Sequence, residues 1–225
     1  CGIGVNGRKI QVATIDDILR ENKTSVLEEK TKRKVFIPEY YRGSHSKVEK
    51  FVSPEIFVSE LEEVDVIGDQ RGFIYKDQLV YDLYDKKSAD RIDFRSSSIL
   101  DVYRGCARVQ IHESEENIAS GIDLVGTGSE NYYHITVEIL SRLAYVDQFE
   151  RYRNIPVLVD ESVRDIPSMN ELFIRVNRYD HPIIYVKKGF SYHVKNMIYI
   201  SYNSWLPINV FHGKSLNCDY MIAES

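Results

Sequence analysis

Four polar residues at helical spacing are the strongest candidates for chemistry in this 225-residue chain. They are Asn131, His134, Glu138 and Arg142, and the last three are separated by four residues each. On a helix, residues four apart stack along one face, close enough for their side chains to hydrogen-bond. An imidazole whose second nitrogen is held by a carboxylate is a competent general base for a hydroxyl group. The spacing therefore predicts a site for acid–base chemistry on a helix.

Two other interpretations of this spacing stay open. His134 can be a buried, hydrogen-bonded core residue, with Glu138 and Arg142 paired on an exposed helix face. His134 and Glu138 can also be two ligands of a metal ion, but the sequence offers no clear third ligand. We therefore expect no metal at this site.

The stretch GIDLVGTGSENYYHITVEILSRL (121–143) contains the elements that position these residues. It predicts a buried strand, a glycine turn and an amphipathic helix of about twenty residues, with Ser129 as the N-cap. Gly126 and Gly128 would let the backbone approach a bound ligand closely. Their G-x-G spacing lacks the third glycine of a dinucleotide-binding fingerprint and is a weak signal alone. One side of the helix is apolar and is expected to pack on a sheet: Ile135, Ile139, Leu140, Leu143 and Val146.

The elements around this unit predict an α/β fold with a Rossmann-like parallel sheet over residues 119–225. A strand at 155–161 follows the first helix, and a second helix is expected after Pro167, with Ser168 as its cap. Strands at 182–189 and 193–201 come next. A β-α-β-α-β order favours parallel strands joined by right-handed crossovers. Ligands usually bind at the carboxyl ends of such strands, where the helix of His134 begins.

Two further segments precede the Rossmann-like half. Residues 51–118 show period-two alternation and short apolar runs, which predict a β-rich antiparallel segment. Residues 1–50 are polar and predict a helical N-terminal arm, opened by a capping box at Thr14 and Asp17. We expect residues 51–225 to form one domain. The start at Cys1 and the irregular stretch before Ser225 suggest that the natural chain is longer.

Composition narrows the classes of partner and compartment. The net charge is −5 and no basic stripe is present, so nucleic acid is not expected as a partner. Cys1, Cys106 and Cys218 are far apart and form no CxxC pair, which argues against a structural zinc site or a disulfide framework. A reducing, cytoplasmic location is the simplest expectation. No apolar run reaches the ~20 residues of a transmembrane helix.

The segment NYYHITVEILSRL (131–143) resembles the N-Y-x-H-(W)-x-x-E/D-x-L-P-R-L motif of glycosyltransferase family 61. VDVIGDQRGFIYKDQLVYDL (64–83) is similar to the strand-rich segment before that motif. IPVLVDE and HPIIYVKKGFSYHVKNMIYIS resemble the strands after it, so the similarity covers roughly residues 51–205. Ile135 and Ser141 stand where many members have tryptophan and proline. The second, donor-binding domain of the family and its signatures are absent.

The resemblance implies one half of a GT-B type enzyme, the acceptor-side half. The implied reaction is an inverting transfer from a nucleotide sugar to a saccharide acceptor, in the biosynthesis of surface or capsular polysaccharide. A missing C-terminal domain would bind the donor, so the fragment alone would be inactive, and no cofactor or metal is implied. Either His134 or Glu138 would be the catalytic base, with the other orienting it. The expected substrate contacts are Asn131, Tyr133, Gly126, Gly128 and Arg142, the last either facing the cleft or supporting Glu138.

Two functions from other classes stay open. The same cleft could belong to a non-catalytic module that binds a glycan or docks a partner. A metal-dependent hydrolase is the other alternative, with His134 and Glu138 among its ligands.

Overall fold

One mixed sheet of eleven strands dominates the fold. The computed structural model describes residues 7–15, 18, 23–37, 47–53, 55–81, 98–205 and 222–223. Parallel pairing joins β12 to β11, β11 to β10 and β10 to β13, and every later neighbour is antiparallel except the pair of β7 and β1. In sheet order the strands are β12 (Ile183–Val186), β11 (Val157–Asp160), β10 (His112–Asp123), β13 (Phe190–Ile200), β5 (Ile56–Ile67), β6 (Phe73–Tyr75), β7 (Gln78–Tyr81), β1 (Arg8–Thr14), β9 (Cys106–Val109) and β8 (Ile99–Tyr103), and β2 (Lys23–Glu28) also pairs with β5.

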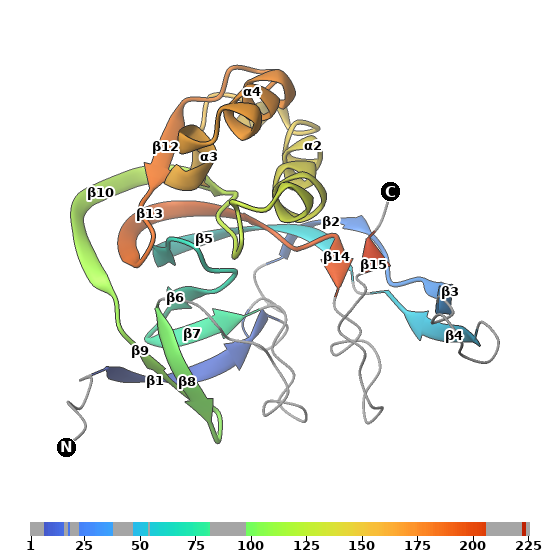
Figure 1. The fold of residues 1–225 in the computed structure, drawn as a ribbon, viewed down its shortest axis with the longest axis horizontal. Helices are drawn as coiled ribbons and strands as arrows, with labels where there is room; N and C mark the ends of the chain where they lie inside the picture. Colours follow the sequence, from blue (N-terminus) through green and yellow to red (C-terminus); the bar gives the residue numbers. More distant parts are fainter. Residues whose placement is uncertain are drawn as a thin grey trace.

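The helices occupy two crossovers of the parallel part of the sheet. Figure 1 shows them together on one side of β10 and β13, with β6, β7, β1, β9 and β8 on the other side. Between β10 and β11 lie the π-helix η2 (His134–Ile139), the 3₁₀ turn η3 (Leu140–Arg142), α2 (Leu143–Val146) and the 3₁₀ turn η4 (Glu150–Tyr152), and between β11 and β12 lie α3 (Glu161–Asp165) and α4 (Pro167–Val176).

The Rossmann-like fold that the sequence predicts is wrong. The parallel order of β10, β11 and β12 is present, but β13 lies on the other side of β10 and pairs antiparallel with β5. The parallel strands are therefore one end of a large mixed sheet that is mainly antiparallel. A Rossmann-like sheet needs helices on both faces, whereas here the second face is covered by strands of the same sheet (Figure 1). A β-α-β-α-β pattern fixes local chain order and leaves this long-range pairing undetermined.

The sheet is strongly coiled, and this coiling builds the site. Only Lys187, Lys188 and Gly189 separate β12 from β13, although β11 and β10 lie between those strands in the sheet. Three residues can cross two strands only if the sheet curls back on itself. The curl brings Gly68, just after β5, into a parallel bridge with Lys188. The turn between β5 and β6 thus reaches the edge of the sheet where the helices begin.

Short turns join two of the antiparallel strand pairs in the sheet. β5 runs unbroken through Glu63, although the φ of that residue is 57°. Two-residue turns with positive φ join β6 to β7 at Lys76 and Asp77, and β8 to β9 at Arg104 and Gly105. Turns of this kind match the twist of the strands that they join.

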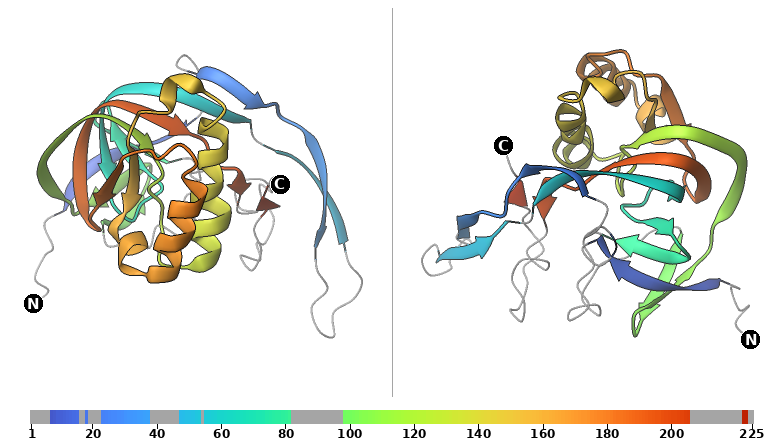
Figure 2. Two further views of the ribbon diagram at one scale, coloured as in Figure 1. Left: turned by 90° about the horizontal axis from the view of Figure 1, so that it is seen from above. Right: turned by 180° about the vertical axis from the view of Figure 1, so that it is seen from behind.

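The N-terminal arm that the sequence predicts to be helical is mostly β-structure. Ile15 and Ile18 are helical, but most described residues of this stretch lie in β1, β2, β3 (Lys32–Ile37) and β4 (Lys47–Val52). The rest of the predicted helix lies outside the described residues. β3 and β4 form a separate two-stranded ribbon that extends away from the main sheet (Figure 2). A second small ladder pairs β14 (Ser204–Trp205) with β15 (Ile222–Ala223).

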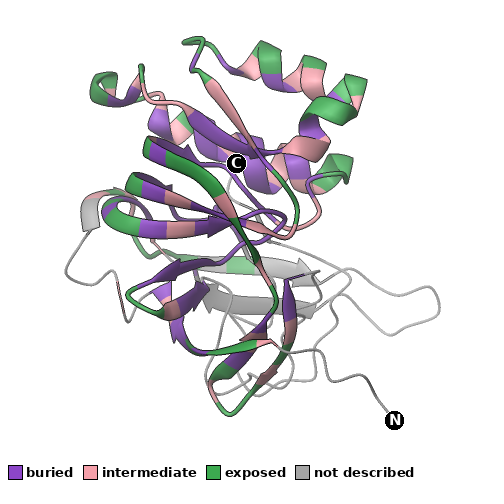
Figure 3. Cartoon of the chain, turned by 90° about the vertical axis from the view of Figure 1, so that its left-hand side faces the viewer, coloured by how far each residue is buried: buried purple, intermediate pink, exposed green. Residues whose placement is uncertain are grey.

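Buried apolar side chains fill both faces of the central strands. Figure 3 shows buried residues on those strands and on the helix sides that face them, with exposed residues on the outer helix surface. The cluster beneath the helices includes the apolar helix residues that the sequence analysis identified: Ile135, Ile139, Leu140, Leu143 and Val146. Packing of this face fixes the rotation of the helix, and so fixes the direction of its polar residues.

Candidate functional site

The helix that carries the candidate residues begins at Asn131 rather than at Ser129. The Asn131 side-chain oxygen accepts a hydrogen bond from the backbone N–H of Tyr133 at 2.9 Å, as an N-cap does. The predicted cap, Ser129, is buried, and its hydroxyl lies 2.6 Å from that of Ser162 at the start of α3. The helix start is therefore capped by a residue of the motif itself.

The helix is not a regular α-helix. It is π-helical from His134 to Ile139, and the Leu140 N–H bonds back to the Ile135 carbonyl, five residues earlier. Two hydroxyls bond to backbone carbonyls four residues earlier, Thr136 to Tyr132 at 2.7 Å and Ser141 to Val137 at 2.6 Å. Such bonds often bend helices, and π-turns are frequent at functional sites.

His134 and Glu138 are brought together as the spacing predicts. Nδ1 of His134 lies 3.1 Å from Oε1 of Glu138, although the pair lacks the angles of a hydrogen bond. The Glu138 side chain is fully buried, whereas the imidazole is 35% exposed. A buried carboxylate thus lies next to an imidazole that is accessible to solvent. Because Nδ1 lies beside Glu138, Nε2 is the nitrogen left for an incoming group.

Arg71 is the residue of this site that the sequence analysis missed. It lies in the turn between β5 and β6, and its guanidinium forms a buried ion pair with Oε2 of Glu138. The Arg71 guanidinium also lies over the ring of Tyr202, 4.6 Å from its centre. The only sequence signal was a charged residue next to glycine in GDQRG, between two apolar strands. Arg71 is far from Glu138 along the chain, so the sequence did not predict their ion pair.

The surroundings of His134 favour the neutral imidazole. Burial lowers the pKa of His134, and the positive charge of Arg71 lowers it further. Glu130 acts in the opposite direction and raises the pKa by a smaller amount. The net lowering of the pKa leaves the ring unprotonated at neutral pH, which is the form that accepts a proton.

Arg142 neither faces a cleft nor pairs with Glu138, the two positions expected for it. Its side chain is fully buried, and its two terminal nitrogens donate to the carbonyls of Val125 at 3.1 Å and Ile200 at 3.4 Å. Its guanidinium lies 4.1 Å from the centre of the Tyr202 ring. Burial raises the pKa of nearby Asp123, while the charge of Arg142 opposes that rise. Arg142 therefore ties the end of β10 to the end of β13 inside the protein.

Gly126 and Gly128 use their backbone N–H groups within the protein. The N–H of Gly126 donates to Oδ2 of Asp160 at 3.0 Å, and that of Gly128 donates to Oδ1 of Asp69 at 3.1 Å. Gly128 has a φ of +76°, and a Cβ there would lie 3.1 Å from the His134 ring. Glycine is thus needed at position 128 for both backbone conformation and close packing against the imidazole.

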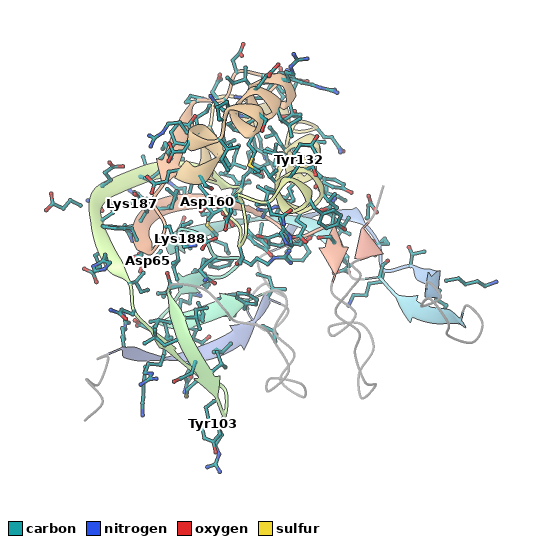
Figure 4. The ribbon with its side chains drawn as sticks, viewed as in Figure 1. Asp65, Tyr103, Tyr132, Asp160, Lys187 and Lys188 are labelled. Atoms are coloured by element: carbon teal, nitrogen blue, oxygen red, sulfur yellow. The ribbon has the colours of Figure 1, made fainter. Side chains whose placement is uncertain are left out.

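Asp160 joins this loop to the turn of Arg71. Its second carboxylate oxygen accepts from the Asp69 N–H at 2.6 Å, while Lys188 pairs with Asp69 at 2.6 Å. Burial raises the pKa of Asp160 from 3.8 to about 7, against the lowering effect of the N–H groups of Gly126 and Asp69. The contact with Asp69 raises the pKa of Lys188. Figure 4 labels Asp160 and Lys188 near the start of α3.

Of the other predicted contacts, Tyr133 is closest to the imidazole. Tyr133 is 44% exposed, and its ring meets the His134 ring edge-on, with centroids 5.8 Å apart. Asn131 is exposed, but its oxygen is used in the helix cap. The side chains of His134, Glu138 and Tyr133 therefore lie together, whereas Arg142 is buried in the protein interior.

A second histidine with carboxylate neighbours lies elsewhere. Nδ1 of His193 is 2.9 Å from Asp65, and Nε2 is 2.8 Å from Glu63. The bond to Asp65 and, less strongly, the bond to Glu63 raise the pKa of His193. A cavity of about 550 Å³ is lined by His193 and Asp65 together with Glu113 and Asn117.

Within the described part of the chain, no three His, Cys, Asp or Glu residues are grouped as metal ligands. Nor do the described residues contain a helix long and apolar enough to span a membrane. Comparison with family models, curated proteins and solved structures gives no match.

Proposed function

We propose that this protein takes part in sugar transfer, with His134 as the base that activates a hydroxyl of a saccharide acceptor. The observation that carries the proposal is a solvent-reachable imidazole whose Nδ1 faces a fully buried carboxylate at 3.1 Å. The similarity of residues 131–143 to the glycosyltransferase family 61 motif supports sugar transfer as the chemistry. That similarity leaves the base as either His134 or Glu138. The burial of Glu138 and its pairing with Arg71 favour His134.

The proposed step moves one proton and one sugar. Nε2 of His134 takes the proton from the acceptor hydroxyl, and the hydroxyl oxygen forms a bond to the anomeric carbon. The bond from that carbon to the phosphate oxygen breaks, and its electron pair leaves with the nucleoside diphosphate. Attack opposite the leaving group inverts the anomeric configuration. His134 then returns its proton to water.

In this proposal Glu138 orients the ring, and Tyr133 offers an exposed aromatic face beside the base. The nucleotide-sugar donor would be held by a separate domain, as the family resemblance implies. No metal or cofactor is part of the proposed step. The acceptor would be a saccharide in the synthesis of a surface polysaccharide.

The test measures release of nucleoside diphosphate by the natural polypeptide that contains this chain. The donors are UDP-glucose, UDP-N-acetylglucosamine, UDP-xylose and GDP-mannose, each with a mixture of oligosaccharide acceptors. We expect acceptor-dependent release with one donor, and a loss of roughly 10²–10⁴-fold in His134→Asn, the usual contribution of a general base. His193→Asn is the matched control and should keep its activity. Equal rates for wild type and His134→Asn would remove His134 from the mechanism.

A further inference from the structure

The buried ion pair beneath His134 involves a segment remote in sequence from the motif. Glu138 is fully buried and Arg71 is 6% exposed, so solvent screens neither charge well. A buried carboxylate is costly unless a cation and hydrogen bonds compensate it. Arg71 supplies the cation from the turn between β5 and β6.

Resting on the function proposed above, we propose that Arg71 is a positioning residue that holds Glu138 in place and keeps His134 ready to accept a proton. The Gly68–Gly72 turn thereby has a role in the site of His134. Arg71 acts through Glu138 and through its own charge, with no contact to substrate.

The turn is fixed to the loop at the start of the His134 helix. Asp69 accepts from the N–H of Gly128, and the Asp69 N–H donates to Asp160, which also binds the N–H of Gly126. Lys188 pairs with the other oxygen of Asp69. These contacts anchor the turn at Asp69, two residues before Arg71, and limit how far the guanidinium can move.

Close packing adds to this anchoring. A Cβ at Gly68 would come within 2.2 Å of the Lys187 carbonyl oxygen, so only glycine allows the backbones to approach this closely. The Tyr202 ring lies beneath the Arg71 guanidinium, and its hydroxyl donates to the Val125 carbonyl at 3.0 Å. A planar guanidinium stacked on an aromatic ring has few orientations available. Its free edge is therefore presented to Glu138.

The charge of Arg71 has two consequences for the imidazole. By pairing with Glu138, it occupies a carboxylate that would otherwise stabilise a protonated His134. By its own proximity it lowers the pKa of His134 further than burial alone does. Both consequences keep Nε2 available as a proton acceptor near neutral pH.

The test reads the ionisation of His134 directly, by NMR titration of its ring protons in the 225-residue chain. The resonance is assigned by its loss in His134→Asn. We expect Arg71→Gln to raise the pKa of His134, and Arg71→Lys to move it back towards the wild-type value. The matched control is Arg151→Gln, because Arg151 also lies over a tyrosine ring and pairs with a glutamate, Glu60, away from this site.

A pair of variants covers the case in which Arg71→Gln does not fold. Replacing both partners avoids leaving an unpaired buried charge, so Arg71→Gln/Glu138→Gln is compared with Glu138→Gln alone. We expect the higher His134 pKa in the double variant, because it lacks the arginine charge. An unchanged pKa in both comparisons would overturn the role of Arg71. Since the titration needs no substrate, this result is independent of whether the chain transfers sugar.

Discussion

His134 and His193 show how surroundings separate two similar histidines. Their side chains are 35% and 42% exposed, and each lies within about 3 Å of a carboxylate. The pKa of His134 is lowered by burial and by Arg71, whereas the pKa of His193 is raised by its bonds to Asp65 and Glu63. The surroundings therefore favour the neutral form of His134 and the protonated form of His193.

Besides burial, the two histidines differ in their charged partners. Glu138 is fully buried and forms an ion pair with Arg71. The positive charge of Arg71 therefore offsets the effect of the Glu138 carboxylate on His134. Asp65 and Glu63 are solvated and bind the two nitrogens of His193 directly. A histidine with both nitrogens occupied has none left for a substrate proton. The cavity beside His193 therefore does not make it the better candidate for a base.

The largest predicted effect concerns the carboxylate partner of each histidine. Glu138→Ala leaves the Arg71 charge buried and unpaired, and should lower the free energy of unfolding by ~3–5 kcal/mol. Asp65→Ala breaks a partly exposed pair and should cost less than ~1 kcal/mol. Urea denaturation of both variants gives the comparison. The apolar double variant Arg71→Met/Glu138→Leu should regain most of the lost stability. Similar losses for Glu138→Ala and Asp65→Ala would show that the two sites do not differ in this way.

The contact within the motif could be predicted because it is local. Positions 134 and 138 share a helix face whatever the fold, and the apolar residues 135, 139 and 143 set the buried side. Strand β11, helix α4 and the β-rich character of residues 51–118 followed from the same kind of short-range periodicity. Apolar periodicity did not predict the π-helix, which is accompanied by hydroxyl bonds from Thr136 and Ser141 to the backbone.

The rest of the site depends on contacts between distant segments. Arg71 reaches Glu138 because the sheet coils until Gly68 lies beside Lys188, and no window of sequence shows that coiling. The Rossmann-like prediction failed for the same reason, because β13 finds partners in both β10 and β5. The family resemblance implied that Arg142 either faces the cleft or supports Glu138. Its direction is set by carbonyls of Val125 and Ile200, at the ends of two other segments.

Asp160 extends the comparison to a carboxylate whose partners are backbone N–H groups. Its pKa is raised from 3.8 to about 7, so the folded state binds a proton that the unfolded state has released. This contribution to stability is fully present below pH 3.8 and is lost as pH rises towards 7. Asp160→Asn should therefore flatten the fall in unfolding free energy between pH 4 and 7. The control is Asp165→Asn at an exposed position of α3, and equal slopes for wild type and Asp160→Asn would exclude a raised pKa.

The smallest predicted effect is the opposite pH dependence of the two histidines. The folded-state pKa of His193 lies above 6.5, so its contribution is present below pH 6.5 and lost as pH rises through the folded value. The folded-state pKa of His134 lies below 6.5, so the unfolded state binds the extra proton and stability increases as pH rises from that pKa to 6.5. Urea denaturation across pH 5 to 8 should give slopes that change in opposite directions for His193→Gln and His134→Gln. Each change should stay below about 1 kcal/mol, because both rings are partly solvated. Slopes that change in the same direction would mean that the pKa of His134 is not lowered in the folded state, and would count against His134 as the base.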